Sequence, residues 1–510
     1  MASKIEFDRR AFMARVGICG IGASGLGSFG TLPLLTAAEL ELDPLQVRAG
    51  SGVDHLVTLL ETTDRDDLLE VVAQRIRAGT TYRELLAALL LAGVRNVQPR
   101  PSVGFKFHSV LVVHSAHLAA VGSPIEDRWL PLFWAIDYFK STQLEEASKT
   151  GWQQAPVDES RVPRPSQAKS ALIAALDNWD VEAADVATVG MVRSAGANAM
   201  FELLCRYGAR DFRSIGHKAI YVANGFRTLQ CIGWQYAEPV MRSLVFALLN
   251  HNGEPNPANS DLTPDRDWRI NLERETTLGA AWQDGAREPV ATRELVEALR
   301  TASSEAASEL AVEMLNRGVA PQSLWDGILL ASGELLMQQP GIIGLHSVTT
   351  ANAMHYAYRH AADDQTRRLL LLQNCAFLPH FRASAGGRGE LGTDSIFNIE
   401  VPDDLNPNSV EQLEEIFAAV SSHRKVAAAK VLGWLQGGGV AEDFVSVARR
   451  MTFTKGRDAH DYKFSSAVLE DYAAVSPEYR SLFLALSVFN LRGSGDRDNQ
   501  LIERAQTALS

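Results

Sequence analysis

The chain repeats itself over long distances, and this repetition limits its possible folds more than any other feature of the sequence. A shift of 239 positions places residues of the first half on identical residues of the second, and a shift of 243 aligns a further block. The first shift pairs Leu56 with Leu295, Gly79 with Gly318, Leu85 with Leu324, Leu90 with Leu329, Leu91 with Leu330, Ala92 with Ala331 and Pro101 with Pro340. The second pairs Gly190 with Gly433, Gly196 with Gly439, Phe201 with Phe444 and Arg206 with Arg449. We therefore predict an internal duplication.

Apolar residues recur at the three- and four-residue spacing of helices nearly throughout the chain. Leu68, Val72 and Ile76 show this spacing, and Gly79 follows them as a residue that ends a helix. Only residues 396–401 favour an extended stretch, which is too short to build a sheet. The sequence thus predicts an all-α fold, a duplicated helical-repeat bundle with halves related by a pseudo-two-fold axis.

Polar connectors suggest how this bundle is divided. We expect a leader at residues 1–38, a first helical half at 50–250, a connector at 251–289 and a second half at 290–510. Each half splits again into two similar quarters. The two halves are expected to pack as one domain.

The leader resembles a twin-arginine export signal. Arg9 and Arg10 precede a weakly apolar, glycine-rich segment at 16–35, and small residues follow at 36–38. This pattern predicts a periplasmic protein exported by the twin-arginine route. If the arginine pair is fortuitous, the chain is expected to be cytoplasmic.

Composition excludes several classes of function. The net charge of −12 argues against a nucleic-acid partner, because phosphate binding needs a basic face. No run of 18 apolar residues predicts a membrane span. The four cysteines are dispersed without a CxxC pair, so neither a zinc knuckle nor a disulfide framework is expected.

The most informative residues are four histidines at equivalent places in the four quarters. They are His108, His217, His346 and His460, and each is expected to open an apolar helix. Neutral imidazole is a common ligand for iron, copper, zinc and nickel. Any one of them alone could cap a helix instead, but the same position in four quarters favours a metal site between the two halves.

Lys463 distinguishes the fourth quarter, because it lies three residues after His460 and shares its helix face. An ammonium group beside a metal cation is disfavoured by like charge. Lys463 could lose its proton, or react with carbon dioxide to give a carbamate that serves as an oxygen ligand. The alternative is a lysine that reaches solvent or pairs with Asp461 or Glu470.

These motifs resemble the questin oxidase-like family, over most of residues 50–510. The resemblance rests on His346-Ser347-Val348-Thr349 with Ala353 behind it, and on the His460-x-x-Lys463 ending. It implies a mononuclear non-haem iron bound by His108, His217, His346 and His460, with Lys463 on or near the metal. Fungal members of that family include oxidases that cleave anthraquinone rings with molecular oxygen. The leader departs from the family's pattern, and the substrate need not be an anthraquinone.

We therefore expect an iron-dependent oxidase or monooxygenase that acts on an organic, aromatic small molecule with O2. One alternative is a metal-dependent hydrolase, in which the metal activates water. The other is a helical-repeat scaffold without enzymatic activity. The His460-Asp461 pair is also typical of HD-type phosphohydrolases. That class needs further histidine and aspartate ligands on neighbouring helices, and the sequence has no matching HxxxD motif.

The remaining histidines are expected to be packing or surface groups. His114 and His117 lie too far around the helix from His108, and His355 and His360 lie in a polar segment. A further set has no counterpart in the other half, namely His55, His251, His380 and His423. No residue can be assigned as a general acid or base, because Asp461 and Glu470 could as readily be solvated as catalytic.

Overall fold

The fold is all-α, as the sequence predicts. The computed structural model describes residues 52–99, 107–249, 255–401 and 410–510. Within these ranges no strand occurs, and one isolated bridge pairs Ala286 with Val319. The twin-arginine-like leader at 1–38 lies outside the described residues.

Helices follow one another through short connections in both halves of the chain. The first half contains α4 (Asp54–Thr62), α5 (Leu68–Arg77), α6 (Tyr82–Asn96), α7 (His108–Leu111), α8 (Val113–Val121), α9 (Leu130–Lys149), α10 (Pro165–Asp177), α11 (Val181–Ser194), α12 (Ala197–Ala209), α13 (His217–Ile232) and α14 (Ala237–Leu249). After α15 (Thr263–Arg274), the second half contains α16 (Pro289–Ala298), α17 (Ser304–Asn316), α18 (Pro321–Gln338), α19 (Ile342–His360), α20 (Asp364–Gly386), α21 (Val410–Ser422), α22 (Arg424–Gln436), α23 (Ala441–Lys455), α24 (Ala459–Ala474), α25 (Pro477–Ser487) and α26 (Gln500–Leu509).

Local sequence explains where several of these helices begin. Thr81 accepts a hydrogen bond from the backbone N–H of Glu84, whose side chain accepts in return from the N–H of Thr81, a capping box that starts α6. The helix α18 begins with Pro321 in its first turn, where a missing N–H costs nothing. These two helices start 239 residues apart, as the first shift requires. The order of helices thus agrees with the predicted duplication, which itself stays a prediction.

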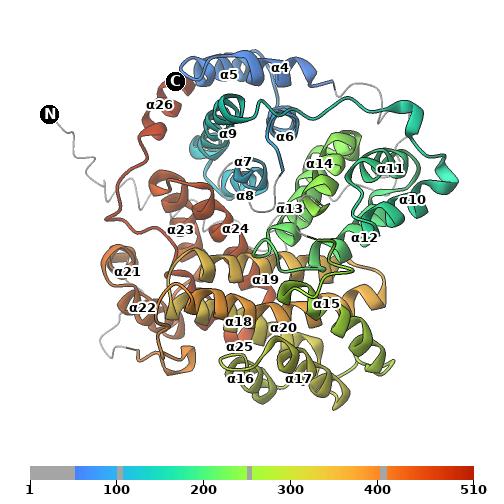
Figure 1. The fold of residues 1–510 in the computed structure, drawn as a ribbon. Coiled ribbons are helices and arrows are strands. Elements are labelled where there is room, and N and C mark those ends of the chain that lie inside the picture. Colours follow the sequence, from blue (N-terminus) through green and yellow to red (C-terminus); the bar gives the residue numbers. More distant parts are fainter. Residues whose placement is uncertain (1–51, 100–106, 250–254, 402–409) are drawn as a thin grey trace.

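Four helices that carry the candidate histidines surround a common interior. Going around it, α7 packs on α13, α13 on α19, α19 on α24, and α24 on α7, with α8 following α7. Figure 1 shows these helices near the middle of the molecule, with α4, α5 and α9 at one side and α16, α17, α18 and α20 at the other. The first two come from the first half of the chain and the last two from the second. The fold therefore brings the N-terminal ends of four distant helices together.

One expectation about the less regular segments is wrong in detail, and another of these segments contains a helix that was not predicted. Residues 396–401, expected to be extended, include the short 3-10 helix η5 (Ile396–Asn398), which begins where Ser395 accepts a hydrogen bond from the N–H of Phe397. The segment 251–289, expected to be a polar connector, contains α15. The polar sequence did not predict this helix, because α15 docks through ion pairs more than through apolar side chains.

The docking of α15 rests on a fully buried ion pair. Asp265 of α15 accepts two hydrogen bonds from Arg213, at 2.9 Å to Nε and 2.6 Å to Nη2, and both side chains have at most 1% of their surface exposed. Arg213 lies in the short loop just before His217. The connector therefore braces the segment from which α13 begins.

Two further expectations concern spans and disulfides. Among the described residues, no helix combines the length and the apolar character that crossing a membrane requires. Cys205, Cys231 and Cys375 are all free thiols. No disulfide framework therefore supports the part of the chain that the structure describes.

The buried pair makes a first prediction about stability. Asp265→Ala should lower the free energy of unfolding by about 3–5 kcal/mol, because it leaves a buried guanidinium without its carboxylate. Denaturant unfolding measures this loss. As a control, Asp261→Ala removes an exposed carboxylate that pairs with Arg266 and should change stability little. Equal losses in the two variants would contradict the bracing role of α15.

Candidate metal centre

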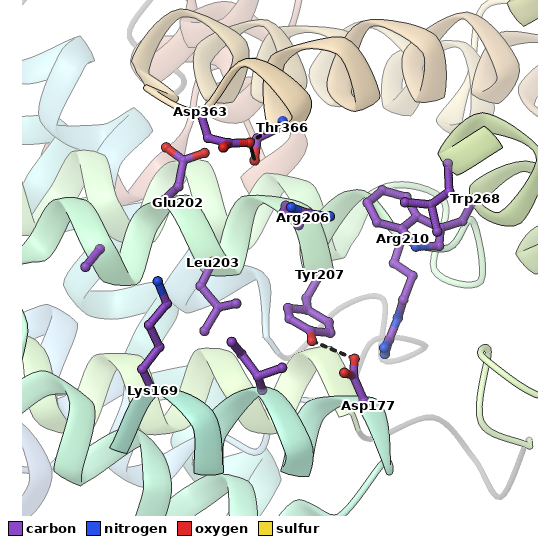
Figure 2. Close-up of a pocket in the computed structure, with 13 residues that line it drawn as sticks. Lys169, Asp177, Glu202, Leu203, Arg206, Tyr207, Arg210, Trp268, Asp363 and Thr366 are labelled. Atoms are coloured by element: carbon purple, nitrogen blue, oxygen red, sulfur yellow. Dashed lines mark hydrogen bonds between the residues drawn. The ribbon is translucent and has the colours of Figure 1, made fainter. Parts of the chain in front are cut away.

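Among the described residues, two places stand out where a ligand could bind, and the first is a groove of about 550 Å³. It lies between α10, α12, α15 and the start of α20, as Figure 2 shows. Its carboxylates are engaged within the protein: Asp177 accepts from Tyr207 at 2.6 Å, and Glu202 accepts from the N–H of Ala362 at 2.8 Å. None of the predicted ligands lines this groove, so it is not the pocket expected around the histidines.

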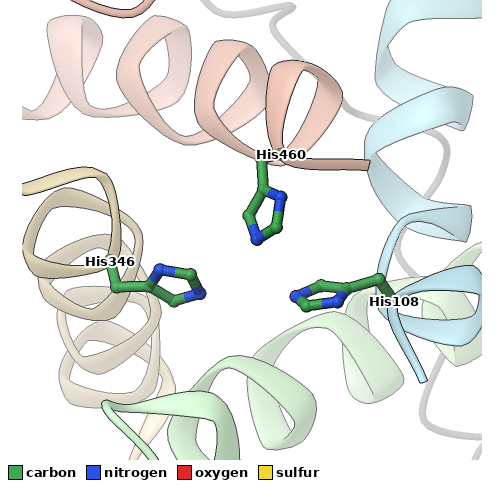
Figure 3. Close-up of side chains that lie close together, drawn as sticks. All are labelled: His108, His346 and His460. Atoms are coloured by element: carbon green, nitrogen blue, oxygen red, sulfur yellow. The ribbon is translucent and has the colours of Figure 1, made fainter. Parts of the chain in front are cut away.

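The second place is the interior where the four ligand helices begin. His108, His346 and His460 are buried and offer ligand nitrogens that all lie within 4.8 Å of one another, close enough to bind a metal ion. Figure 3 shows their three rings pointing from different helices toward one space. His217 joins them, because its Nε2 lies 3.1 Å from Nε2 of His108 and 3.1 Å from Nε2 of His346. All four predicted histidines are thus neighbours.

Hydrogen bonds fix the tautomers of two of these rings. Nδ1 of His217 lies 2.7 Å from the carbonyl oxygen of Ser214, and Nδ1 of His346 lies 2.7 Å from that of Ile342. A carbonyl can only accept, so each Nδ1 donates and carries the ring's proton. Burial first, and nearby positive charge second, lowers the pKa of His217 to about 3 and keeps the ring neutral. Both Nε2 atoms therefore present lone pairs to each other at 3.1 Å.

The four rings follow one another around the interior. Neighbouring ring centroids lie 5.1 Å (His108–His217), 4.6 Å (His217–His346), 5.3 Å (His346–His460) and 4.5 Å (His460–His108) apart. The diagonal between His108 and His346 is longer, 6.4 Å. Two nitrogens bound to one metal at about 2.1 Å lie about 3.0–3.4 Å apart. The observed separations of 3.1 Å fit neighbouring ligands of one metal ion.

Asp458 orients the fourth ring, and the sequence analysis missed it. Its Oδ1 accepts a hydrogen bond from the backbone N–H of His460 at 2.7 Å, which caps α24, and lies 3.3 Å from Nδ1 of the same histidine. Nε2 of His460 is buried and has no hydrogen-bond partner. A carboxylate behind a histidine is a frequent arrangement at metal sites, because it turns the other ring nitrogen toward the metal.

A close approach between the start of α13 and α19 positions His217. Gly216 has a φ of +82°, which glycine adopts without strain, and a Cβ at this position would lie 1.8 Å from Oγ1 of Thr350. Thr350 follows His346 by one turn of α19. Only a glycine therefore lets the start of α13 approach α19 closely enough for His217 and His346 to meet.

Lys463 lies in the same interior and has no carboxylate partner. It is 2% exposed, and its Nζ is buried without a hydrogen-bond partner. Burial lowers its pKa to about 7. The structure thus excludes the alternative in which Lys463 reaches solvent or pairs with Asp461 or Glu470. Its positive form also contributes, after burial, to the lowered pKa of His108.

The two acidic residues expected to be solvated are instead engaged in ion pairs. Asp461 is buried and accepts hydrogen bonds from Arg492, 2.9 Å from both Nε and Nη2. Glu470 accepts from Arg227 at 2.6 Å. The expectation failed because both arginine partners come from distant parts of the sequence.

The remaining histidines are mostly packing groups, as expected. His114, His117 and His355 are buried, and His355 lies against Trp325 with ring centroids 4.7 Å apart. His380 pairs with Asp267 at 2.5 Å. None of these belongs to the group of nitrogens that could share one metal.

One detail of the histidine placement is wrong. His108 and His217 open their helices and His460 is the second residue of α24, but His346 lies a full turn inside α19, which begins at Ile342. The turn at Gly341 starts the helix early and provides the carbonyl of Ile342 that fixes the ring of His346.

Comparison with known proteins finds no matching family model, no matching curated protein and no matching solved structure. The resemblance to the questin oxidase-like family therefore stays a prediction.

Lys463 gives the metal-free protein a distinctive dependence on pH. The unfolded lysine holds its proton up to a pKa of about 10.4, whereas the folded one releases it near 7. Because the unfolded state binds more protons between these values, stability should rise with pH there, by about 1.4 kcal/mol per unit at most. Denaturant unfolding with chelator at pH 7 to 9.5 measures the slope. Lys463→Met should remove it, whereas Lys425→Met, at an exposed pair, should not.

Proposed function

We propose that the protein is a non-haem iron oxidase or monooxygenase that acts on an aromatic small molecule with O2. The proposed iron ligands are His108, His217, His346 and His460, completed by Lys463. The observation that carries the proposal is the pair of neutral imidazoles, His217 and His346, whose lone pairs face each other at 3.1 Å. Two lone pairs repel at this distance unless a cation lies between them.

The donor set fits a transition metal of the iron-to-copper range. Imidazole nitrogens suit iron, copper, nickel and zinc. Zinc sites usually have four protein ligands or fewer. Four histidines with Lys463 would offer five donors, which favours a redox-active metal over zinc.

Each protein group has a defined task in this proposal. Bound iron would supply the one-electron chemistry through which O2 reacts with an organic molecule. Ser214 and Ile342 hold two rings through their carbonyl groups, and Asp458 holds a third. The helices shut bulk water out of the interior, since Lys463 and His346 are at most 2% exposed.

Lys463 is proposed to bind the metal as a neutral amine or as a carbamate. A pKa near 7 leaves a large neutral fraction at physiological pH. The neutral amine can attack carbon dioxide, which forms a nitrogen–carbon bond and releases one proton. The resulting carbamate carries a negative charge that offsets the charge of the metal.

Aromatic side chains near the ligands suit an aromatic substrate. Phe107 precedes His108 and lies against Tyr221, with ring centroids 4.7 Å apart and an edge-to-face geometry. Tyr462, adjacent to Lys463, stacks on Trp134 at 4.2 Å. These rings pack on one another in the core, and an aromatic substrate would be recognised through edge and stacking contacts of the same kind.

The rival functions explain the site less well. A helical scaffold has no use for four neighbouring imidazoles, three of them buried, whose nitrogens approach one another. A hydrolase remains the outcome to expect if zinc occupies the site. Export by the twin-arginine route, which carries folded proteins, would suit a metal site assembled from four distant helices.

Metal content tests the site. The purified protein should hold about one iron per chain. His346→Ala should lose it, because the variant lacks one of the four histidine ligands. Elemental analysis gives the metal and its stoichiometry. His355→Ala is a matched control, since His355 is buried on the same helix but lies outside the cluster. Zinc in place of iron would favour hydrolysis, and no metal after reconstitution would contradict the site.

Oxygen consumption tests the reaction. The iron-loaded protein should take up O2 in the presence of a phenolic or quinonoid substrate, measured with an oxygen electrode and by mass spectrometry of the product. Lys463→Met should keep iron on its four histidines yet lose most of this uptake. Iron-loaded protein that consumes no O2 with any member of a broad aromatic panel would contradict an oxidase.

A further inference from the structure

A second group of polar side chains connects the same four helices. This polar layer lies farther along them than the histidines, toward the C-terminal ends of α13, α19 and α24. Arg227 and Glu470 each lie ten residues after a candidate ligand, His217 and His460. Asn224 lies seven residues after His217, and Asn352 six after His346. At 1.5 Å per residue, this layer is about 10–15 Å along the helices from the candidate metal.

Arg227 is the centre of this layer. Its Nη2 donates to Glu470 at 2.6 Å, and its Nη1 donates to Asn224 and to Asn352, both at 3.1 Å. Its guanidinium also lies 4.1 Å above the ring of Tyr356. With 6% of its surface exposed, it contacts three ligand helices at once.

The two asparagines extend the layer to every ligand helix. Asn224 donates to the carbonyl of Leu111 in α7 at 3.0 Å. Asn352 of α19 donates to Glu470 at 3.1 Å and to Asp471 at 3.0 Å, both on α24. One connected set of hydrogen bonds therefore joins the helices that carry His108, His217, His346 and His460.

We infer that Arg227 is a positioning residue, which sets the rotation and axial register of the ligand helices and thereby the geometry of the metal centre. This inference rests on the metal centre proposed above. A guanidinium is planar, so its donors meet their three partners in only one arrangement of the helices. A metal site needs each ligand within about 0.5 Å of its proper position. If one helix turned about its own axis, its histidine would move by more than this distance.

Stability alone is a weak reason for such a network. Replacing a buried ion pair by apolar side chains of similar size is often neutral or stabilising. The network's own contribution is the fixed arrangement of its partners. A test must therefore separate the loss of geometry from the loss of folding energy.

The chain offers a closely matched control for that test. Arg242 of α14 pairs with Asp185 of α11, with exposed side-chain fractions of 7% and 34%, against 6% and 35% for Arg227 and Glu470. Neither partner of this control pair lies on a ligand helix. Arg227→Met and Arg242→Met thus each remove an arginine–carboxylate pair of similar burial, the first on a ligand helix and the second on α14, which carries no candidate ligand.

The experiment titrates the full-length protein with Co²⁺ and records affinity and visible absorption, which reports coordination geometry. Arg227→Met should bind Co²⁺ at least about 10-fold more weakly and with a shifted spectrum, as losses around metal ligands do. Arg242→Met should lose comparable thermal stability but keep the wild-type spectrum and stay within about twofold in affinity. The double variant Arg227→Met with Glu470→Met should recover stability but not affinity.

Three outcomes would overturn the inference. They are an unchanged spectrum and affinity in Arg227→Met, equal weakening in Arg242→Met, or recovery of affinity together with stability in the double variant. If the wild-type protein binds no metal, the proposed function itself fails. Wild-type binding with an unaffected Arg227→Met variant contradicts the positioning role alone.

Discussion

The close approach of uncharged imidazole nitrogens is the constraint on which the centre of this structure depends. Nε2 of His217 lies 3.1 Å from two other ring nitrogens, and the pair with His346 has no proton to share. Such a contact is unfavourable in a core that also excludes water. Three features maintain this contact. They are the packing of the four helices, Gly216 in the left-handed backbone conformation, and the buried ion pair of Arg213 and Asp265 before α13.

The charges near this centre are arranged in an unusual way. Asp461 and Glu470, the acidic side chains on α24 closest in sequence to the ligands, are each neutralised by an arginine. Burial first of all lowers the pKa of His217 and His346, which keeps these two rings neutral, and lowers that of Lys463 to about 7. Asp458, 3.3 Å from Nδ1 of His460, is then the carboxylate closest to the cluster.

Much of this site was visible in the sequence. The shift of 239 with one deletion pairs His108 with His346, the shift of 243 pairs His217 with His460, and the spacing of three places Lys463 on the face of His460. Helix periodicity gives the fold class for the same reason, since it depends only on neighbours along the chain. The early start of α19 was missed because it depends on the turn at Gly341.

What the sequence could not provide is the pairing of polar groups between distant helices. Arg227 and Glu470 are 243 residues apart, and nothing local indicates that they meet. Asp458 was detectable in principle, because an aspartate at a helix start two residues before a ligand is a recognisable cap. The connector helix α15 was missed because its weakly apolar sequence gives no periodic signal, and its docking depends on Arg213.

The contrast between the two polar layers distinguishes a ligand site from a structural network. In the layer around Arg227, the guanidinium meets carboxylate and amide oxygens that accept its hydrogen bonds. Near the histidines, three buried nitrogens, Nδ1 of His108, Nε2 of His460 and Nζ of Lys463, have no hydrogen-bond partner. Burying an unsatisfied polar group costs about 1–3 kcal/mol. Three such groups in one interior add to that cost, and two of these nitrogens, Nε2 of His460 and Nζ of Lys463, belong to the proposed donor atoms of a metal ion.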